Sequence, residues 1–181
     1  MKSERVFRVG LGTDRHRLVP GRRFVLGGVE IPSETGEDGH SDGDVLLHAI
    51  ADALLGAAAL GDIGGLFPPG DPRWKDADSA LLLAEVWRMV RRAGWQLENL
   101  DCVIHLEKPK FLPWRTEVIR SVRRILAEAG GIPEEGGVFV KAKTGEGLGE
   151  VGQGLVVEAQ AVCLLSGTAA DFSPAGADSV R

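Results

Sequence analysis

Three side chains in the first third of the chain have the types and the spacing needed to share a metal ion. Asp14 and His16 are two residues apart, after a stretch rich in β-branched and aromatic residues. In an extended strand, side chains two residues apart leave the backbone on the same side. His48 offers a further imidazole nitrogen, and one carboxylate with two imidazoles and an open position resembles a catalytic zinc site. Ordinary surface pairs also show the Asp-x-His spacing, so the spacing leaves both interpretations open.

A dense polar sequence, His-Ser-Asp-Gly-Asp at residues 40–44, precedes the helical pattern that contains His48. Ser41 with Asp44 three residues later resembles a capping box, in which the serine accepts a backbone hydrogen bond and the acid favours the positive end of the helix dipole. A helix N-terminus also binds phosphate, because its first N–H groups lack partners within the helix. Capping accounts for Ser41 and Asp44 but not for His40, so a functional site and a plain helix start both stay open.

A glycine-rich loop follows a strand pattern at residues 141–149. Its backbone amides, its two lysines and Thr144 can contact phosphate oxygens, and Glu146 can hold a divalent cation bound to the same phosphates. The alternative is a flexible hairpin with solvated charges. The turn at residues 108–113, Lys-Pro-Lys-Phe-Leu-Pro, exposes backbone groups that suit a nucleobase pocket without being diagnostic of one.

The pattern of apolar residues predicts the elements that position these side chains. Strands are expected at residues 5–12 and 23–31, joined by a Pro-Gly turn and paired with each other. Further along, helices are expected at about 42–60, 79–93 and 113–130, and strands at 100–106, 138–143 and 155–165. This order predicts a single α+β domain over residues 1–165, with a mixed β-sheet and helices packed on one face. Residues 166–181 have little apolar content, which predicts a disordered C-terminal tail.

The composition is that of an ordinary soluble globular protein, with 44% hydrophobic and 26% charged residues in a chain of 181. A net charge of −5 excludes a general nucleic-acid binder. The sequence has neither the apolar core of a signal peptide nor an 18-residue apolar stretch, so we expect a cytoplasmic protein with no membrane partner. The 25 glycines are about twice the usual share, which predicts many special turns.

Taken together, these segments resemble the family of 2-C-methyl-D-erythritol 2,4-cyclodiphosphate synthases of non-mevalonate isoprenoid biosynthesis. The resemblance covers about residues 6–165. Its most specific parts are the His-Ser-Asp-Gly-Asp sequence and the Leu-Gly-Asp-Ile-Gly sequence at 60–64. The other matching segments are 12–16, 52–58, Phe67-Pro68, Pro109-Lys110, and the glycine-rich loop with Lys141, Ala142, Thr144, Glu146 and Leu148-Gly149.

The resemblance implies a metal-dependent phosphorus–oxygen lyase that works as a homotrimer, with active sites between subunits. The substrate would be 4-diphosphocytidyl-2-C-methyl-D-erythritol 2-phosphate, whose 2-phosphate attacks its own β-phosphorus, closes a ring and expels CMP. Zn²⁺ would bind Asp14, His16 and His48, and Mg²⁺ or Mn²⁺ would bind with the substrate diphosphate near Glu146. Positioning and charge neutralisation can supply most of the rate of such a phosphoryl transfer.

The resemblance also implies roles for individual residues. His40, Ser41 and Thr144 would stabilise the transition state. Asp62, Ile63 and Gly64 would hold the methylerythritol, and residues 106–112 with 142–144 would form the cytidine pocket. The full substrate-binding set is Asp14, His16, His40, Ser41, Asp62, Ile63, Gly64, Phe67, Asp71, Leu106, Pro109, Lys110, Phe111, Leu112, Ala142, Lys143, Thr144, Glu146, Glu150 and Gln153.

Two positions depart from the family pattern. Glu150 stands where members have an aromatic residue lining a cavity on the trimer axis, and Gln153 stands where they have an arginine able to meet phosphate. Binding of an isoprenoid diphosphate in that cavity is therefore not expected to carry over, although Lys143 can supply part of the missing positive charge.

Two other functions use the same residues. A metal-dependent phosphohydrolase would use water in place of the internal phosphate as the nucleophile. A non-catalytic trimeric binding module would use the Asp-x-His pair and His48 as a structural zinc site. Structural zinc is normally closed by four protein ligands, and no fourth ligand is evident in the sequence.

Overall fold

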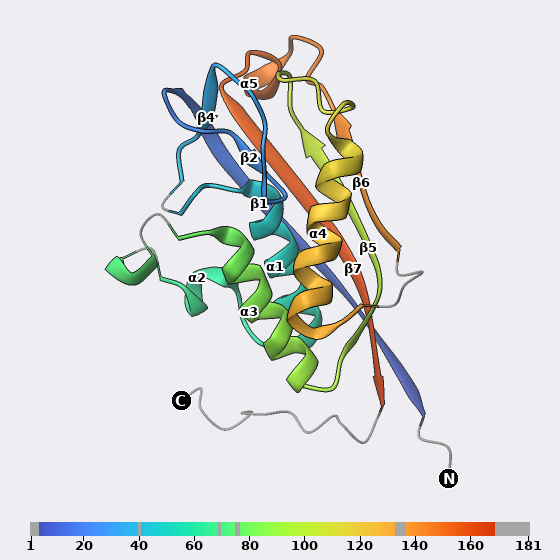
Figure 1. The fold of residues 1–181 in the computed structure, drawn as a ribbon. Coiled ribbons are helices and arrows are strands. Elements are labelled where there is room, and N and C mark those ends of the chain that lie inside the picture. The colour runs from blue at the N-terminus through green and yellow to red at the C-terminus, as the bar shows by residue number, and fades with distance from the viewer. Residues whose placement is uncertain (1–3, 40, 69, 75–76, 133–136, 169–181) are drawn as a thin grey trace.

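The structure is a computed structural model that describes residues 4–39, 41–68, 70–74, 77–132 and 137–168 (Figure 1). Its strands are β1 (Arg5–Pro20), β2 (Val25–Leu26), β3 (Val29–Glu30), β4 (Thr35–Glu37), β5 (Gln96–His105), β6 (Gly137–Lys143) and β7 (Val156–Thr168). Its helices are α1 (Val45–Ala58), α2 (Ile63–Leu66), α3 (Ser79–Arg92), α4 (Arg115–Gly130) and α5 (Gly149–Gly152), with a 3₁₀ turn at Pro72–Trp74.

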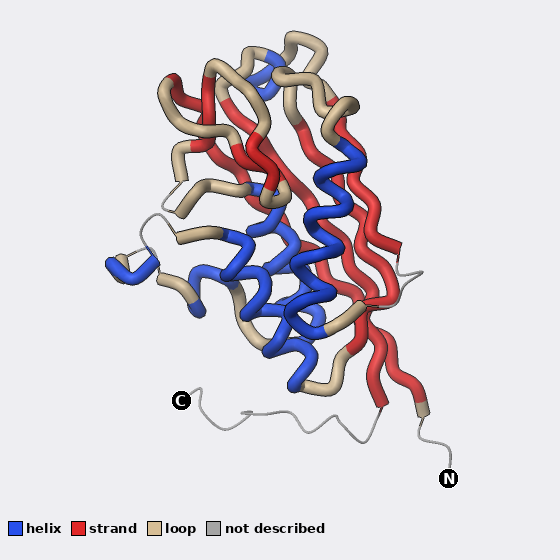
Figure 2. Tube along the Cα trace, viewed as in Figure 1, coloured by secondary structure: helices blue, strands red, loops and turns tan. Residues whose placement is uncertain are grey.

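The main sheet has five strands in the order β4-β1-β7-β5-β6. β5 and β6 run parallel and the other neighbours run antiparallel, so the sheet is mixed, as predicted. α1 packs against β1 and β7, α4 packs against β6, and α3 packs on α1 and α4. The three long helices therefore form one layer on one face of the sheet, which confirms the predicted architecture (Figure 2). Among the described residues, no helix has the length and apolar content needed to cross a membrane.

The prediction that residues 5–12 pair with residues 23–31 is wrong. β1 continues to Pro20 and pairs with β4 and β7, whereas β2 and β3 pair only with each other, as a separate hairpin. Gly27 and Gly28 both have positive φ, 63° and 73°, which is the backbone of a tight two-residue hairpin turn. This turn divides the predicted second strand into β2 and β3, which lie outside the main sheet.

The backbones of β1 and α1 are in close contact. A Cβ atom at Gly10 would lie 1.9 Å from the Ala53 carbonyl oxygen, and one at Gly12 would lie 2.0 Å from the Ala49 carbonyl oxygen. Only glycine leaves room for the helix at these two positions, because any side chain would overlap the helix backbone. His48 is thereby brought beside the strand that carries Asp14 and His16.

The predicted domain boundary at residue 165 falls inside a strand. β7 continues to Thr168, which pairs with Arg5 at the far end of β1, and Ser166 is buried. Residues 166–168 therefore belong to the sheet, because the long β1 offers them backbone partners. The rest of the predicted tail, residues 169–181, lies outside the described residues.

Candidate metal centre and adjoining cavities

Asp14 and His16 of β1 and His48 of α1 form the one group of potential metal ligands found among the described residues. Asp14 Oδ2 lies 2.9 Å from His48 Nδ1 and 3.2 Å from His16 Nε2, and the three ligand atoms lie within 4.8 Å of one another. The two imidazole rings meet edge to face, with centroids 5.3 Å apart. The three residues predicted to share a metal ion, hereafter the metal group, are therefore brought together, and all three side chains are partly buried.

Outer partners hold the ring of His16. Its Nδ1 lies 2.6 Å from the Gly43 carbonyl oxygen and 3.1 Å from Glu37 Oε2. Glu37 is fully buried, and its Oε2 also accepts a hydrogen bond from the Val45 N–H at 2.9 Å. With Nδ1 donating to these oxygens, the lone pair of Nε2 is turned toward Asp14, which is how proteins prepare a histidine to bind a metal.

The charges of the group favour a cation between its members. Burial acts to lower the pKa of His16, but the hydrogen bond to Glu37 and the charge of Asp14 raise this pKa to about 9. Burial acts to raise the pKa of Asp14, but the hydrogen bond with His48 and the histidine charges hold it below its ordinary value. Burial raises the pKa of Glu37 to about 8, and the hydrogen bond with His16 acts against this rise. A divalent cation would take the place of the proton that Asp14 and Glu37 favour on His16.

Two hydroxyl groups face the outer nitrogen of His48. Its Nε2 lies 2.9 Å from Ser79 Oγ and 3.1 Å from Ser41 Oγ. Ser79, the first residue of α3, and Glu37 are contacts that the sequence reasoning missed. Each lies far along the chain from the histidine it contacts, and neither belongs to a recognisable local pattern, so only the folded arrangement reveals them.

The capping-box prediction is wrong about which residue caps the helix. Asp44 is the N-cap of α1, because its carboxylate accepts from the Leu47 N–H at 3.0 Å, and it also accepts from the Gly28 N–H at 2.7 Å. Gly43 has a φ of 82°, so the helix cannot begin at residue 42 as predicted. The Ser41 hydroxyl is thus free of capping and lies at the metal group. His40 lies outside the described residues.

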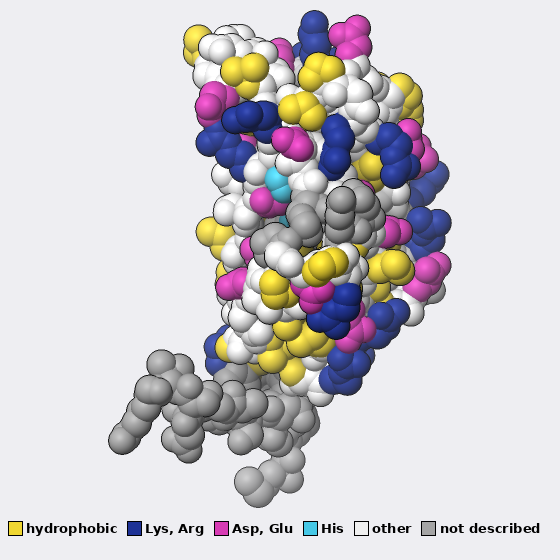
Figure 3. Space-filling view, turned by 90° about the vertical axis from the view of Figure 1, so that its left-hand side faces the viewer, with side chains coloured by type: hydrophobic (Ala, Val, Ile, Leu, Met, Phe, Trp, Pro, Cys, Tyr) yellow, Lys and Arg dark blue, Asp and Glu magenta, His cyan; other side chains and the backbone are white. Residues whose placement is uncertain are grey.

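A cavity of about 150 Å³ joins the metal group to the loop that contains α2. Asp52 of α1 ties this loop down, because its carboxylate accepts from the Ile63 N–H at 2.8 Å. In Figure 3, histidine side chains reach the surface beside acidic ones on this side of the molecule. The residues that line the cavity are His16, Ser41, His48, Ile63, Gly64, Phe67, Trp74 and Leu82.

Two residues of the same loop that were predicted to bind substrate accept hydrogen bonds from residues close to them in the chain. Asp62 caps α2 by accepting from the Gly65 N–H at 2.7 Å. Asp71 accepts from the backbone and the guanidinium of Arg73, which hold its pKa below the ordinary value. Neither residue lines the cavity beside the metal group.

A second cavity, of about 250 Å³, lies where β5 and β6 end. It brings together the two segments predicted to form a cytidine pocket. Two hydrogen bonds join these segments: the Leu106 N–H donates to the Lys143 carbonyl oxygen at 2.9 Å, and the Gly145 N–H donates to the Glu107 carboxylate at 3.0 Å. The lining residues are Leu106, Lys110, Phe111, Leu112, Arg115, Lys141, Ala142, Lys143 and Thr144. Pro109, which follows a cis peptide bond, is adjacent in the chain but does not line the cavity.

The remaining predicted residues lie beyond both cavities in the single chain. Glu146 is exposed in the loop after β6, with a φ of 51°. Glu150 of α5 pairs with Arg15 of β1, on the sheet face opposite the helices, and Gln153 is exposed just after α5. The two cavities share no lining residue among the described parts of the chain.

This chain is similar to one protein family and to curated proteins that share one name. The model of the YgbB family matches residues 7–166. Curated proteins named 2-C-methyl-D-erythritol 2,4-cyclodiphosphate synthase are similar along nearly their whole length. The one from Moorella thermoacetica is 58% identical over 87% of this chain and 94% of its own. The one from Treponema denticola is 54% identical over 87% of this chain and 95% of its own.

Solved structures similar to this chain include synthases of the same name. A CDP-bound 2C-methyl-D-erythritol-2,4-cyclodiphosphate synthase superposes with a TM-score of 0.77 at 42% identity and covers 87% of this chain and 99% of its own. The CDP complex of IspF from Plasmodium falciparum has a TM-score of 0.76 at 31% identity and covers 90% of this chain and 97% of its own.

Proposed function

The chain belongs to the YgbB family, and from that premise we propose how its residues carry out the family's reaction. The protein converts 4-diphosphocytidyl-2-C-methyl-D-erythritol 2-phosphate to 2-C-methyl-D-erythritol 2,4-cyclodiphosphate and CMP, in isoprenoid precursor biosynthesis. An oxygen of the 2-phosphate forms a bond to the β-phosphorus, and the bond from that phosphorus to the bridging oxygen breaks. The bridging oxygen leaves with CMP, so the enzyme is a phosphorus–oxygen lyase. The observation that carries the mechanism is the Asp14, His16 and His48 group beside a cavity.

Asp14, His16 and His48 hold Zn²⁺ in this proposal. One carboxylate, two imidazoles and an open position suit catalytic zinc, and the outer nitrogen of each imidazole already has an oxygen partner. When bound, the ion supplies positive charge against the phosphate that is attacked. The protein's own part is to fix the three ligand atoms and to keep their open side toward the cavity that Ile63 and Gly64 line.

The methylerythritol lies along residues 62–64 in this proposal, with Phe67 closing the cavity beside it. Ser41, which borders the same cavity, and His40 stabilise the transition state. Asp71 would bind substrate only after exchanging its contact with Arg73.

The cytidine occupies the cavity at the ends of β5 and β6. A volume of about 250 Å³ with backbone groups, three lysines and an arginine in its wall suits a nucleotide base and its attached phosphate. Thr144, at the edge of this cavity, contacts the diphosphate. Glu146 lies two residues further along an exposed loop, where its carboxylate can reach Mg²⁺ or Mn²⁺ bound to that diphosphate.

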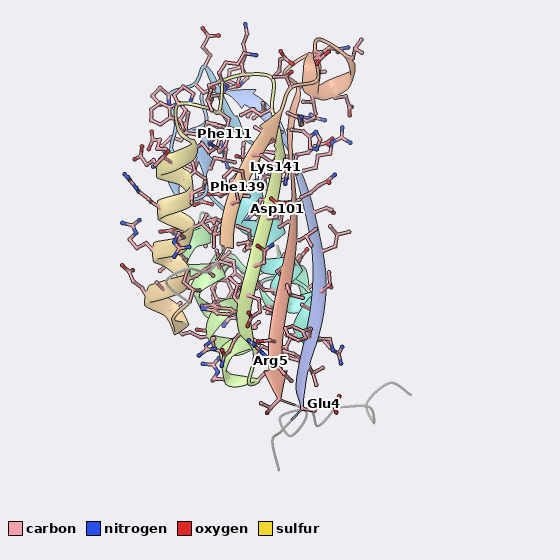
Figure 4. The ribbon with its side chains drawn as sticks, turned by 90° about the vertical axis from the view of Figure 1, so that its right-hand side faces the viewer. Glu4, Arg5, Asp101, Phe111, Phe139 and Lys141 are labelled. Carbon is pink, nitrogen blue, oxygen red and sulfur yellow. The ribbon has the colours of Figure 1, made fainter. Side chains whose placement is uncertain are left out.

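A homotrimer would bring the two kinds of cavity together. The two cavities have no described lining residue in common. In the proposed trimer, the cytidine cavity of one subunit lies beside the metal group of its neighbour. The sheet face opposite the helices exposes an apolar group suited to burial in such an assembly, with Val9, Leu11, Phe139 and Val162 each 42–69% exposed. Asp101 and Lys141 form an ion pair on neighbouring strands of the same sheet, near Phe139 (Figure 4). We place the trimer in the cytoplasm, which suits a small-molecule substrate and a composition with no nucleic-acid or membrane signature.

Removal of metal tests this mechanism directly. We expect a zinc chelator to stop CMP release, and added Zn²⁺ with Mg²⁺ to restore it, because charge neutralisation is central to the phosphoryl transfer. Metal analysis of the purified protein should give one zinc per chain. Unchanged turnover by metal-free protein would contradict the proposal, and zinc without any turnover would instead favour a binding module.

Enlarging Ala142 tests the nucleotide cavity. The Ala142→Leu side chain would fill part of the space at the ends of β5 and β6, so we expect CMP to bind about tenfold more weakly, as measured by isothermal titration. The zinc content should not change, because Ala142 lies outside the metal group. Ala127→Leu, on an exposed position of α4, adds the same bulk outside both cavities and should bind CMP normally. Equal CMP binding by both variants would show that the cytidine lies elsewhere.

A further inference from the structure

We propose that Ser79 and Asp42 are positioning residues that hold His48 in the tautomer and orientation needed to bind the metal. The inference rests on the metal-binding role proposed above for His48. It concerns the outer nitrogen of the ring, Nε2, which lies on the side away from Asp14. Neither residue is a metal ligand, and both act through the imidazole.

The contacts form a chain from a carboxylate to the imidazole. Ser79 Oγ lies 2.9 Å from His48 Nε2, and the Ser79 hydroxyl also hydrogen bonds to Asp42 Oδ1. The second carboxylate oxygen of Asp42 accepts from the Ser79 backbone N–H at 3.1 Å. The carboxylate of Asp42 thus binds both the hydroxyl and the backbone N–H of Ser79, and Ser79 itself is only 1% exposed.

The direction of these hydrogen bonds follows from the chemistry of the groups. An ionised carboxylate only accepts, so the one hydroxyl proton of Ser79 is donated to Asp42. The Ser79 oxygen then offers lone pairs to His48, and only a ring nitrogen that carries hydrogen can use them. Nε2 must therefore be the N–H nitrogen, which leaves the Nδ1 lone pair facing Asp14 as a metal ligand.

Ser41 alone would not fix the ring in this way. Its Oγ lies 3.1 Å from His48 Nε2 and 3.3 Å from Ser79 Oγ, and it accepts from the Gly43 N–H at 3.2 Å. No carboxylate holds its hydroxyl proton among the described contacts, so Ser41 can either donate to His48 or accept from it. In the contacts of Ser79 with Asp42 and His48, by contrast, the donor and the acceptor of each hydrogen bond are fixed.

The same pair joins the elements on which the ligand depends. Asp42 precedes α1, which carries His48, and Ser79 begins α3, which packs on α1. The Asp42 N–H also donates to the Ala77 carbonyl oxygen at 3.1 Å. The start of α3 is therefore fixed against the loop before α1, so that the hydroxyl is already in place when the ring binds an ion.

The test is the zinc affinity of the full-length Ser79→Ala variant, measured by competition with a chromophoric chelator. We expect zinc to bind about 10- to 100-fold more weakly than to the wild type, the usual effect of removing an outer partner of a metal-binding histidine. Asp42→Asn should weaken zinc binding in the same direction. An amide has one acceptor oxygen where the carboxylate has two, and its N–H₂ group can leave the Ser79 proton free to turn toward His48.

Asp78→Ala is the matched control for damage to α3. Asp78 is the N-cap of this helix and accepts from the Ala80 N–H at 2.8 Å, but it does not contact Ser79 Oγ or His48. Its loss should destabilise the helix by a typical capping contribution while zinc affinity stays within about twofold of the wild type. An equal loss of zinc affinity in Asp78→Ala and Ser79→Ala would show that Ser79 acts only through the stability of the helix.

A spectroscopic readout separates orientation from stability. In zinc-loaded wild type, long-range proton–nitrogen NMR spectra should show His48 protonated at Nε2, with a proton that exchanges slowly with water. Only four histidines contribute to such spectra. This proton should exchange quickly in Ser79→Ala and remain slow in Asp78→Ala. Wild-type exchange and affinity in Ser79→Ala would overturn the inference, whereas failure of the wild type itself to bind zinc would overturn the metal-binding proposal instead.

Discussion

The His48→Ala variant is expected to lose tight zinc binding and to release CMP at least about a thousandfold more slowly than the wild type. The substitution leaves Asp14 and His16 as the only protein ligands of the group. Charge stabilisation by a bound metal contributes several kcal/mol to a phosphoryl-transfer transition state, and each 1.4 kcal/mol corresponds to about tenfold in rate. Zinc content by mass spectrometry and CMP release by chromatography measure the two effects separately.

The fold should survive this substitution, because His48 is one partly buried side chain at the edge of the core. Far-ultraviolet circular dichroism should therefore match that of the wild type. His105→Ala is the matched control for zinc binding, since it removes an imidazole of β5 that lies outside the metal group. Normal zinc content in His48→Ala, or an equal loss in His105→Ala, would contradict the assignment of His48 as a ligand.

The Gly12→Ala variant is expected to lose about 3 kcal/mol or more of its free energy of unfolding, because a methyl group would be forced into the backbone of α1. Its Cβ would lie 2.0 Å from the Ala49 carbonyl oxygen and 2.5 Å from the Ala53 nitrogen. The helix must move away from β1 to make room, and His48 moves with it, away from Asp14. Urea denaturation measures the stability, and zinc titration of the folded fraction measures the distortion of the site.

The Gly56→Ala variant, in α1, is expected to be more stable than the wild type, in contrast to Gly12→Ala. Gly56 is exposed in α1, and a Cβ atom there would have no neighbour within 4 Å. Alanine restricts the unfolded chain and favours helix, so this variant should gain about 0.5–1 kcal/mol in stability and keep its zinc affinity. Equal stability of Gly12→Ala and the wild type would mean that β1 and α1 are not in backbone contact.

Asp14 and His16 could be predicted from the sequence as candidate metal ligands, because their relation depends on local geometry. Asp14 and His16 share a face by strand periodicity alone, and β1 continues through both residues. The contact with His48 depends on how closely α1 packs on β1. Glycine inside a strand often marks such a close approach, so Gly10 and Gly12 were a signal for it.

The surroundings of the ligands could not be predicted in the same way. Glu37 and Ser79 come from segments whose own sequence gives no reason to expect contact with a histidine. β1 pairs with β7, which comes from the opposite end of the domain, and not with the nearer segment at 23–31. Such contacts are set by the whole packed sheet, whereas local patterns report only period and turn chemistry.

Phosphorus NMR of the product formed from 4-diphosphocytidyl-2-C-methyl-D-erythritol 2-phosphate, in ¹⁸O-labelled water with Zn²⁺ and Mg²⁺, tests the proposed cyclisation most sharply. Ring closure uses the substrate's own 2-phosphate as the nucleophile. We therefore expect CMP together with a cyclic diphosphate, two coupled phosphorus signals and no ¹⁸O from the solvent. An open-chain bisphosphate carrying one solvent oxygen would show that water is the nucleophile and would overturn the proposed cyclisation.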